Sequence, residues 1–384
     1  MIERSIFREE HDMWRETVRK FVEREIVPFH AQWEEDGIVP RELWLKAGQE
    51  GMLCCTVPEE YGGLGLDYLF DVVVFEELWR VGASGPGFLI HTDLVATYIM
   101  SFGTEEQKRH WLPRMAKGEV IGCFGLTEPD YGSNPSGMIT RAKQQADGSW
   151  VINGAKMWIT NGSTSQVAVI WAKTGDDTSD KSIRGFLVPT STKGFSARDQ
   201  KGKLSLRASD TSELVLADVH VPAEAILPKS SGIKSPLMCL TNARYGISWG
   251  VMGAALACYE EAQRYSKTRV MFNGPIGGTQ IQQVRLADML TEIVKGQLLA
   301  LHVGRMKDLG TYTPVQVSIL KRNNVNVATN IAREARRLLG GAGILAEYAS
   351  MRHMANLESV YTYEGTHDVH SLIIGQAITG MNAF

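Results

Sequence analysis

The chain has 384 residues, of which 44% are hydrophobic and 22% are charged, the composition of a soluble globular protein of two or three domains. Its formal net charge of -3 predicts no strong attraction to nucleic acid or to an anionic membrane, and no apolar run is long enough to span a bilayer. The first ten residues lack the apolar core of a signal peptide. We therefore expect a cytoplasmic bacterial protein or the mature form of a mitochondrial matrix protein.

The first predicted domain, residues 1–118, is helical. Apolar residues recur at helical spacing from 7 to 27, where Pro28 ends the run, and again over 68–81. After a glycine-rich break, a third helix is expected over 88–102.

The second predicted domain, residues 119–228, is rich in short β-type runs separated by Gly, Asp, Ser and Pro. This texture is typical of a small antiparallel barrel or sandwich. The predicted strands cover 150–152, 167–171, 185–188 and 213–216.

The third predicted domain, residues 229–384, is helical again. Four long periodic stretches joined by short loops predict an antiparallel bundle. These helices are expected over 236–268, 279–309, 314–339 and 367–379. The expected fold class is therefore mainly α with a β-barrel middle domain.

The cysteines are odd in number and contain no CxxC pair, so we expect reduced thiols in the core and no metal site. They are Cys54, Cys55, Cys123, Cys239 and Cys258. Neither a nicotinamide-binding GxGxxG after a strand, nor a GxxxxGK[ST] phosphate loop, nor a GxSxG nucleophile elbow is present.

Near the end of the chain, Glu364 stands beside Gly365, just before a predicted helix. A carboxylate there either caps the helix or acts as a base in a water-poor pocket. The adjacent glycine would let another molecule approach the backbone closely.

A metal cluster is the competing interpretation of the same segment, with His367, Asp368 and His370 beside Glu364. The two histidines are three residues apart in a first helical turn. A helix start capped by Thr366, with an acid at the positive end of the helix dipole, explains the pattern better.

Two polar motifs stand among the predicted strands. Residues 124–129 lead to a turn at 132–134, and residues 157–162 follow a strand. Trp158 could support a flat conjugated ring, with hydrogen bonds from Thr127 and Thr160, and the turn could hold a phosphate. Each motif alone is also compatible with an ordinary barrel turn.

Together, these motifs resemble the acyl-CoA dehydrogenase family, and the resemblance covers essentially the whole chain. The motifs that match are 126–133, 158–160, 269–272, Gln280, 340–343 and 363–366. The resemblance implies an FAD-dependent oxidoreductase that converts an acyl-CoA thioester to the trans-2-enoyl-CoA. It also implies a homotetramer and an electron-transferring flavoprotein as electron acceptor.

The resemblance assigns cofactor-binding residues by position. The expected FAD-binding residues are Phe124, Leu126, Thr127, Gly132, Ser133, Trp158, Ile159, Thr160, Phe272, Arg337, Thr366 and Asp368. Four further residues are expected to reach the FAD of a neighbouring subunit, namely Arg269, Gln280, Gly340 and Gly341.

Glu364 is the catalytic base that the resemblance implies, and Arg244 would orient it. Some family members carry the base just before this arginine, but that position here is Ala243. The expected substrate-binding residues are Phe88, Ser133, Asn242, Arg244, Tyr363 and Gly365.

Within the family, the C-terminal two-thirds of the chain is most similar to glutaryl-CoA dehydrogenases, and the first third is more similar to long-chain acyl-CoA dehydrogenases. The stretches that resemble glutaryl-CoA dehydrogenases are 123–129, 204–209, 242–247, 321–324 and 362–368.

Glutaryl enzymes hold the distal carboxylate of the substrate with an arginine, which aligns here with Gly85 or Pro86, and carry a glutamate that aligns with Trp79. Burying an unpaired carboxylate is costly. We therefore expect a neutral acyl chain with residues 88–90 near its tail, although these apolar residues could equally be ordinary core.

Several alternatives remain open at this stage: a glutaryl-CoA dehydrogenase, an oxidase of the same fold, a dehydrogenase of carrier-protein thioesters, and a helical scaffold without cofactor. The length and branching of the acyl chain are not evident from the residues.

Overall fold

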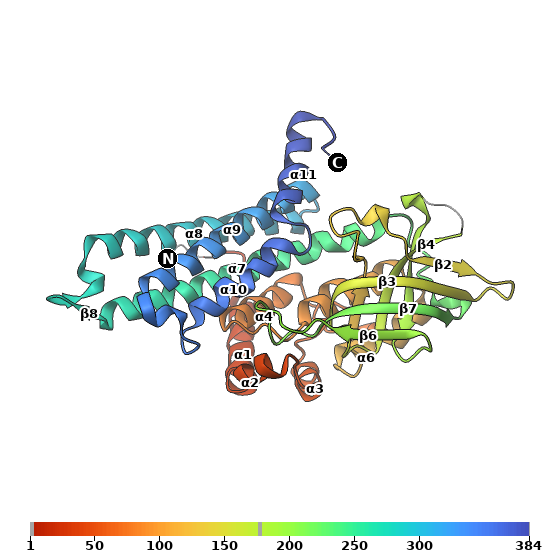
Figure 1. The fold of residues 1–384 in the computed structure, drawn as a ribbon, viewed down its shortest axis with the longest axis horizontal. Coiled ribbons are helices and arrows are strands. Elements are labelled where there is room, and N and C mark those ends of the chain that lie inside the picture. Colours follow the sequence, from red (N-terminus) through yellow and green to blue (C-terminus); the bar gives the residue numbers. More distant parts are fainter. Residues whose placement is uncertain (1–3, 176–178, 384) are drawn as a thin grey trace.

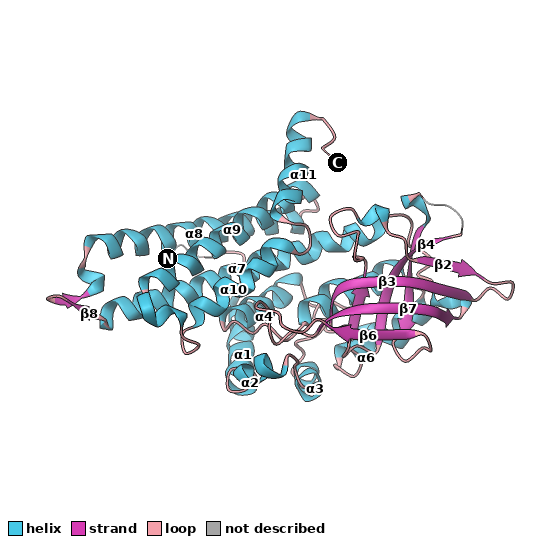
Figure 2. Ribbon diagram, in the orientation of Figure 1, coloured by secondary structure: helices cyan, strands magenta, loops and turns pink. Residues whose placement is uncertain are grey.

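The computed structural model describes residues 4–175 and 179–383. The long C-terminal helices lie at one end of the molecule and the large sheet at the other, with the N-terminal helices beside both (Figures 1 and 2). The N-terminal helices are α1 (Glu9–Glu25), α2 (His30–Asp36), α3 (Arg41–Gln49), α4 (Tyr68–Arg80), α5 (Thr97–Phe102) and α6 (Glu105–Ala116).

The predicted helices at 7–27 and 68–81 are confirmed as α1 and α4. The predicted helix at 88–102 is present but not regular, because Ile90–Ala96 forms a π-helix, η2, that leads into α5. This segment turns three polar side chains inward, and each has a partner. Nδ1 of His91 accepts a hydrogen bond from the N–H of Gly122 (3.1 Å). Thr92 accepts a hydrogen bond from the N–H of Cys54 (3.1 Å), and Asp93 accepts one from the hydroxyl of Tyr68.

The middle region forms one seven-stranded sheet, ordered β1-β4-β2-β3-β7-β6, in which β5 pairs with β4. Its strands are β1 (Gly122–Gly125), β2 (Arg141–Gln144), β3 (Trp150–Thr160), β4 (Val167–Thr174), β5 (Ile183–Pro189), β6 (Phe195–Asp199) and β7 (Thr211–Val221). The expectation of antiparallel pairing is confirmed for β4 with β5 but was wrong for β4 with β1 and β2, to which it runs parallel.

Strand β4 explains how the sheet is anchored to the helices. Its residues from Val167 to Lys173 are buried on both faces. Ile170 belongs to the core of the sheet, whereas Trp171 packs edge to face against Tyr98 of α5, with ring centroids 5.1 Å apart. A strand covered on both sides needs a continuous apolar run, which is the sequence found here.

The C-terminal bundle consists of α7 (Lys234–Thr268), α8 (Gln280–Asp308), α9 (Pro314–Leu338) and α10 (Ala349–Thr362), and a two-stranded hairpin, β8 (Val270–Met271) and β9 (Gly274–Pro275), joins α7 to α8. Helix α11 (His367–Thr379) was expected to be the fourth helix of the bundle but projects from it (Figure 1). Helix α10 takes that place.

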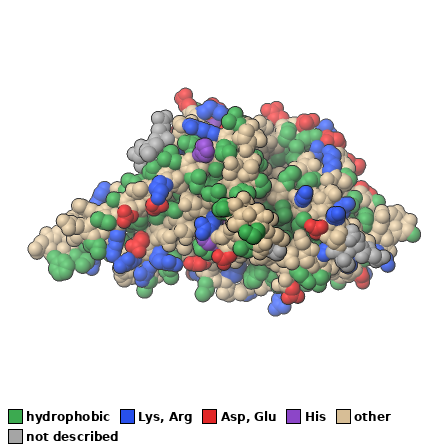
Figure 3. Space-filling view, turned by 90° about the horizontal axis from the view of Figure 1, so that it is seen from above, with side chains coloured by type: hydrophobic (Ala, Val, Ile, Leu, Met, Phe, Trp, Pro, Cys, Tyr) green, Lys and Arg blue, Asp and Glu red, His purple; other side chains and the backbone are tan. Residues whose placement is uncertain are grey.

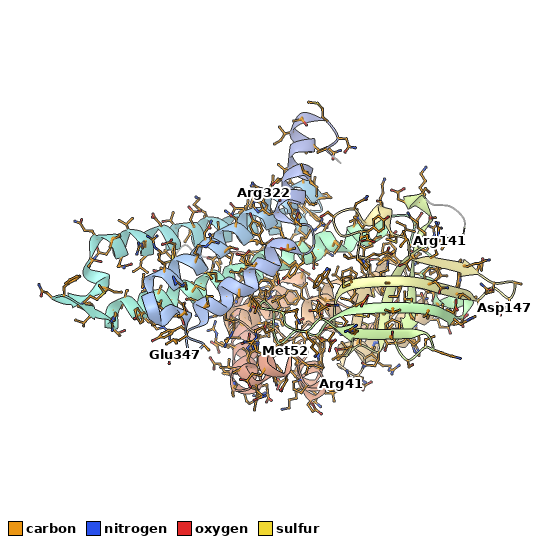
Figure 4. All side chains as sticks on the ribbon, viewed as in Figure 1. Arg41, Met52, Arg141, Asp147, Arg322 and Glu347 are labelled. Carbon is orange, nitrogen blue, oxygen red and sulfur yellow. The ribbon has the colours of Figure 1, made fainter. Side chains whose placement is uncertain are left out.

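Helix α10 escaped prediction because its buried face includes the polar residues Ser350 and His353 beside Leu357 and Val360, which weakens the apolar pattern. Helix α11 is fixed to α9 only near its start. There Arg322, labelled in Figure 4, donates a hydrogen bond from Nε to the Ser371 hydroxyl (2.7 Å).

All five cysteines are buried and free of disulfide bonds. Acidic and basic side chains are interspersed over the face seen in Figure 3. Among the described residues, no helix combines the length and apolar character needed to cross a membrane.

Candidate active site

A cavity of about 1750 Å³ lies where the sheet, the loop before η2, α7, α10 and the turn between α10 and α11 meet. It brings together most of the residues that the sequence singled out. The predicted site residues that line it are Phe124, Leu126, Thr127, Gly132, Ser133, Trp158, Ile159, Thr160, Arg244, Tyr363, Glu364, Gly365 and Thr366.

The turn that carries Glu364 has an unusual backbone. Glu364 has a φ of 51° and Gly365 a φ of 89°, so two successive residues lie in the left-handed region. Glycine is favoured at the second position, because a φ of 89° is strained for other residues and an added Cβ would lie only 3.0 Å from Nε2 of His370. Thr366 then caps α11 by accepting a hydrogen bond from the N–H of Val369 (3.1 Å), as the sequence predicted.

Because Thr366 serves as the helix cap, the Glu364 carboxylate is free for another role. Both of its oxygens are buried and have no hydrogen-bond partner among the described residues. Burial raises the pKa of Glu364 to about 7, although the positive charges of Arg244 and Lys321 act in the opposite direction. An unsatisfied buried carboxylate on a cavity wall is a candidate general base.

Arg244 of α7 holds the backbone beside this carboxylate. Its Nε donates a hydrogen bond to the carbonyl oxygen of Glu364 (2.8 Å). The guanidinium is buried, which lowers the pKa of Arg244, while the Glu364 charge acts to raise it. The arrangement places a fixed positive charge next to the candidate base.

The opposite part of the cavity wall comes from the sheet. Strand β3 has a register shift against β7 between Lys156 and Ile159, and Trp158 there has a φ of 64°. The bulge leaves the Trp158 side chain 61% exposed, although it is a large aromatic group. The N–H of Met157 donates to the carbonyl oxygen of Thr127 (2.9 Å), so the two polar motifs lie side by side.

The described residues of the cavity wall fit a flat aromatic group with a phosphate tail. The exposed indole of Trp158 offers a stacking surface beside Thr160. At Gly132, an added Cβ would meet nothing within 4 Å, so the turn that follows the first motif has open space in front of it.

Two predicted substrate-binding residues do not line the cavity. Phe88 is fully buried and packs edge to face on Trp44, with ring centroids 4.8 Å apart, because it lies on the side of its helix that faces the N-terminal core. Its neighbours Leu89 and Ile90 line the cavity instead. The Asn242 carbonyl accepts a hydrogen bond from the hydroxyl of Tyr68 (3.2 Å), away from the cavity wall.

Another group of predicted cofactor residues lies on the surface, outside the cavity. They are Arg269, Phe272, Gln280, Arg337, Gly340, Gly341 and Asp368. Phe272 is 93% exposed at the tip of the β8–β9 hairpin, which lies at the end of the helical bundle remote from the sheet (Figure 1).

Comparison with known proteins identifies the family to which this chain belongs. Three family models match in order: the acyl-CoA dehydrogenase N-terminal domain over residues 8–119, its middle domain over 123–219 and its C-terminal domain over 230–379. A porcine mitochondrial long-chain specific acyl-CoA dehydrogenase is 35% identical over 98% of this chain and 88% of its own length. The chain belongs to the acyl-CoA dehydrogenase family.

Other relatives of this dehydrogenase span several substrate classes. A human mitochondrial short-chain specific acyl-CoA dehydrogenase is 34% identical over 95% of the chain and 89% of its own length. A glutaryl-CoA dehydrogenase structure from Mycobacterium smegmatis is 49% identical with a TM-score of 0.94, covering 99% of this chain and 97% of that one. Butyryl-CoA dehydrogenase from Megasphaera elsdenii is 31% identical with a TM-score of 0.92, covering 97% and 98%.

The predicted family, fold class and enzyme class are therefore confirmed. Both subfamilies that the sequence resembled are among the relatives, so the comparisons leave the substrate of this dehydrogenase undecided.

Sequence reasoning missed an ion pair beneath the sheet wall of the dehydrogenase. Lys156 and Glu128 are both buried and lie 2.8 Å apart, and Glu128 also accepts hydrogen bonds from the N–H groups of Ile139 and Thr140. The sequence contains a sign of this pair, because the alternation of β3 places Lys156 on the same inward face as Trp150 and Ile152, where a charged side chain needs a partner.

A second missed residue is Lys321 of α9. It lies on the buried face of an amphipathic helix, between Leu320 and Asn324, where a lysine is unusual without a partner. Its hydrogen-bond acceptors include the carbonyl oxygens on either side of Glu364.

Among the described residues, no group of three or more His, Cys, Asp or Glu side chains is arranged to hold a metal ion. His370 in particular is buried, and its Nδ1 lies 3.1 Å from the hydroxyl of Ser318.

Proposed function

We propose that the protein is an FAD-dependent dehydrogenase that oxidises a neutral acyl-CoA thioester to the trans-2-enoyl-CoA. The observation that carries the proposal is the buried Glu364 carboxylate, which has no partner among the described residues and lines the same cavity as Trp158 and Thr160. A base must meet an α-proton in a place that excludes water, and the carboxyl oxygens of Glu364 are shielded from solvent.

FAD is the cofactor of this family, and the described wall residues fit it. Residues 158–160 would contact the isoalloxazine ring. The segment from Phe124 to Ser133 would contact the ring as well and would bind the phosphates. When bound, FAD supplies the acceptor for the hydride that leaves the β-carbon of the substrate.

The residues of this chain would handle the proton. With a pKa near 7, the Glu364 carboxylate is a stronger base than an exposed glutamate and is still ionised in a large fraction of molecules at neutral pH. Arg244 keeps its backbone in place, and hydrogen-bond donors on the Gly365 side would stabilise the negative charge that develops on the thioester carbonyl.

The wall near the expected acyl tail favours a neutral chain. Trp79, Leu89 and Ile90 line it, together with the loop at residues 82–87. His353 also lines it, but burial lowers the pKa of His353 to about 4, so that this side chain is uncharged at neutral pH.

Gly85 could not carry the arginine of a glutaryl enzyme without movement of the backbone. An added Cβ there would lie 2.2 Å from Cγ2 of Val39 and 2.9 Å from the carbonyl oxygen of Ala208. The competing function, oxidative decarboxylation of glutaryl-CoA, is favoured by the 49% identity to the mycobacterial structure of that name.

Turnover on a series of thioesters separates the two functions. We expect butyryl-, octanoyl- or palmitoyl-CoA to bleach the flavin, and glutaryl-CoA to react at least about a hundredfold more slowly because its distal carboxylate would be buried without a partner. Rapid glutaryl-CoA turnover with release of carbon dioxide would overturn the neutral-chain assignment.

The role of Glu364 has its own test, the anaerobic bleaching of enzyme-bound flavin. Glu364→Gln should slow bleaching by about 10³-fold or more, within the range for loss of a general base. Glu358→Gln is the matched control, since Glu358 lines the same cavity from α10 and is given no chemical role. Undiminished bleaching by Glu364→Gln would refute the base assignment.

The remaining assignments are part of the same proposal. The exposed residues at the far end of the bundle, such as Arg269, Gln280 and Gly340, would contact the FAD of a neighbouring subunit in a homotetramer. An electron-transferring flavoprotein would accept the electrons. A cytoplasmic or mitochondrial matrix location also remains a proposal.

A further inference from the structure

The ammonium group of Lys321 is held in a cage of backbone carbonyls around Glu364. Its Nζ donates hydrogen bonds to the carbonyl oxygens of Val360, Tyr363 and Gly365, each at 2.9 Å. The side chain is 1% exposed. All three bonds end on the segment that carries Glu364, and none reaches its carboxylate.

The three acceptors match the protonation state of the lysine. An ammonium group has three N–H donors and a neutral amine has two, so only the protonated form satisfies all three carbonyls. Val360 lies in the last turn of α10, where carbonyl groups lack helical partners, and Tyr363 and Gly365 flank Glu364 in the left-handed turn. The lysine of α9 is therefore hydrogen-bonded to the end of α10 and to the turn on both sides of Glu364.

We propose that Lys321 is a positioning residue that holds the Tyr363–Gly365 turn so that the Glu364 carboxylate points into the cavity. The proposal rests on the proposed role of Glu364 as the base. Lys321 acts through the backbone and its charge, and does not touch the reacting atoms.

The strained turn explains why such a clamp is needed. A glutamate with a φ of 51° has left its preferred backbone region and stays there only when its surroundings hold it. Arg244 supplies one bond to the carbonyl of Glu364 and Lys321 supplies the bonds on either side of it. Without Lys321, the turn would keep one of these restraints.

The charges that face Glu364 come from several elements. Arg244 on α7 and Lys321 on α9 favour its ionised form. Burial raises the pKa values of Asp93 on η2 and Tyr98 on α5, and the charge of Glu364 acts in the same direction. His370 on α11 is neutral, because burial lowers its pKa to about 3. Burial also lowers the pKa of Lys321 to about 7, while the charge of Glu364 acts to raise it.

The experiment compares Lys321→Met, Lys321→Arg and Asn324→Ala in the FAD-loaded enzyme. Asn324 is the matched control, because it lies less than one turn further along α9 and donates buried hydrogen bonds to the carbonyls of Ser248 and Gly296 instead. Each variant is mixed anaerobically with a neutral acyl-CoA thioester between pH 6 and pH 9, and the bleaching rate is followed as a function of pH and substrate concentration.

We expect Lys321→Met to slow bleaching about a hundredfold, the effect of a base misplaced by about 1 Å, with little change in substrate affinity. We also expect the apparent pKa of the rise in rate to move upward by about one unit, since a nearby cation is lost. Lys321→Arg should leave the apparent pKa of the bleaching rate close to that of the parent enzyme, because the positive charge remains. The rate itself should still fall, because the planar guanidinium group cannot donate to three converging carbonyls.

A readout without turnover completes the test. Difference infrared spectra between pH 5 and pH 9 report the carboxyl band that disappears in Glu364→Gln, and its midpoint should move upward in Lys321→Met. Asn324→Ala should lower thermal stability without moving either pKa. If Lys321→Met leaves the infrared midpoint and the bleaching profile where they are in the parent enzyme, the inference is wrong.

The roles of Glu364 and Lys321 can be refuted separately. Normal bleaching by Glu364→Gln would remove the proposed base and, with it, the role of Lys321. If Glu364→Gln abolishes bleaching but Lys321→Met bleaches with the same rate and pH dependence as the parent enzyme, only the role of Lys321 is refuted.

Discussion

The buried ion pair beneath the sheet wall offers a quantitative test of how the cofactor site is supported. Lys156 is fully buried and Glu128 is 2% exposed, and their charged groups lie 2.8 Å apart. Removing one partner of such a pair costs about 3–5 kcal/mol, because the other charge stays in a poorly solvated place. The change to examine is Lys156→Met, which keeps the length of the side chain and removes its charge.

The structure places the expected cost at the lower end of that range. Glu128 keeps two backbone donors after the change, from Ile139 (2.7 Å) and Thr140 (3.0 Å), and these stabilise part of its charge. Lys156 also donates to the carbonyl of Leu126 (3.2 Å), and that bond would be lost. We expect a loss of about 3 kcal/mol in the free energy of unfolding.

The pKa values give the sign of the pH dependence. Burial acts to raise the pKa of Glu128, but the charge of Lys156 and the bonds from Ile139 and Thr140 lower it overall. A lowered pKa means that the stability from the pair is fully present above the pKa of an unfolded glutamate, near 4.3, and is lost as the pH falls through the folded value. The difference between parent and variant should therefore be largest near neutral pH and shrink in acid.

The assay is urea denaturation of the FAD-loaded protein at pH 7 and in acid, with flavin release measured in parallel. Lys143→Met on the neighbouring strand β2 is the control, because Lys143 is exposed and its loss should change stability by less than about 0.5 kcal/mol. A Lys156→Met protein as stable as the control would refute the reasoning that this pair supports the wall.

Three further predictions follow from the site. Burial raises the pKa of Glu364 to about 7, so its charge destabilises the folded state increasingly from about pH 4.5 upward. The Glu364→Gln protein should therefore have a higher melting temperature than the parent at pH 8, with a gain of up to about 3 kcal/mol in the free energy of unfolding, and no gain at pH 4. Equal melting temperatures at pH 8 would contradict this. Trp158→Ala should weaken FAD binding about tenfold, as seen by flavin release on ultrafiltration, while leaving the melting temperature of the flavin-free protein unchanged because the side chain is 61% exposed. Pro86→Arg should raise activity on glutaryl-CoA relative to octanoyl-CoA, since Pro86 lines the cavity and an arginine there could pair with the distal carboxylate; an unchanged activity ratio would show that the carboxylate does not reach this wall.

Much of the architecture was accessible from the sequence because it depends on local patterns. The 3.6-residue repeat of α7 and α9 and the β-branched runs of β4 and β5 are local, and each was recognised at nearly its observed position. The motifs around Glu364 and Trp158 were recognisable for the same reason, since each is a short run of neighbouring residues. The domain limits at 118 and 228 remain a prediction.

Other features required the tertiary structure because they join residues far apart in the chain. The role suggested for Lys321 depends on carbonyls about 40 residues away, and the Lys156–Glu128 pair joins residues 28 positions apart. Helix α10 has polar residues on its buried face, so that only packing against the bundle reveals its place. The direction of Phe88 was also undetermined, since an apolar residue can face either a core or a cavity.

The sequence by itself determined the family and the order of most helices and strands, and it singled out the residues that we propose supply a base and hold a flavin, because these depend on residue type and spacing. Only the tertiary structure decided which of those residues share one cavity, and that Glu364 is left there without a hydrogen-bond partner among the described residues. It also showed that Lys321 contacts the backbone on both sides of Glu364. The physical reason is that burial and electrostatics depend on distances through space, which spacing along the chain does not specify.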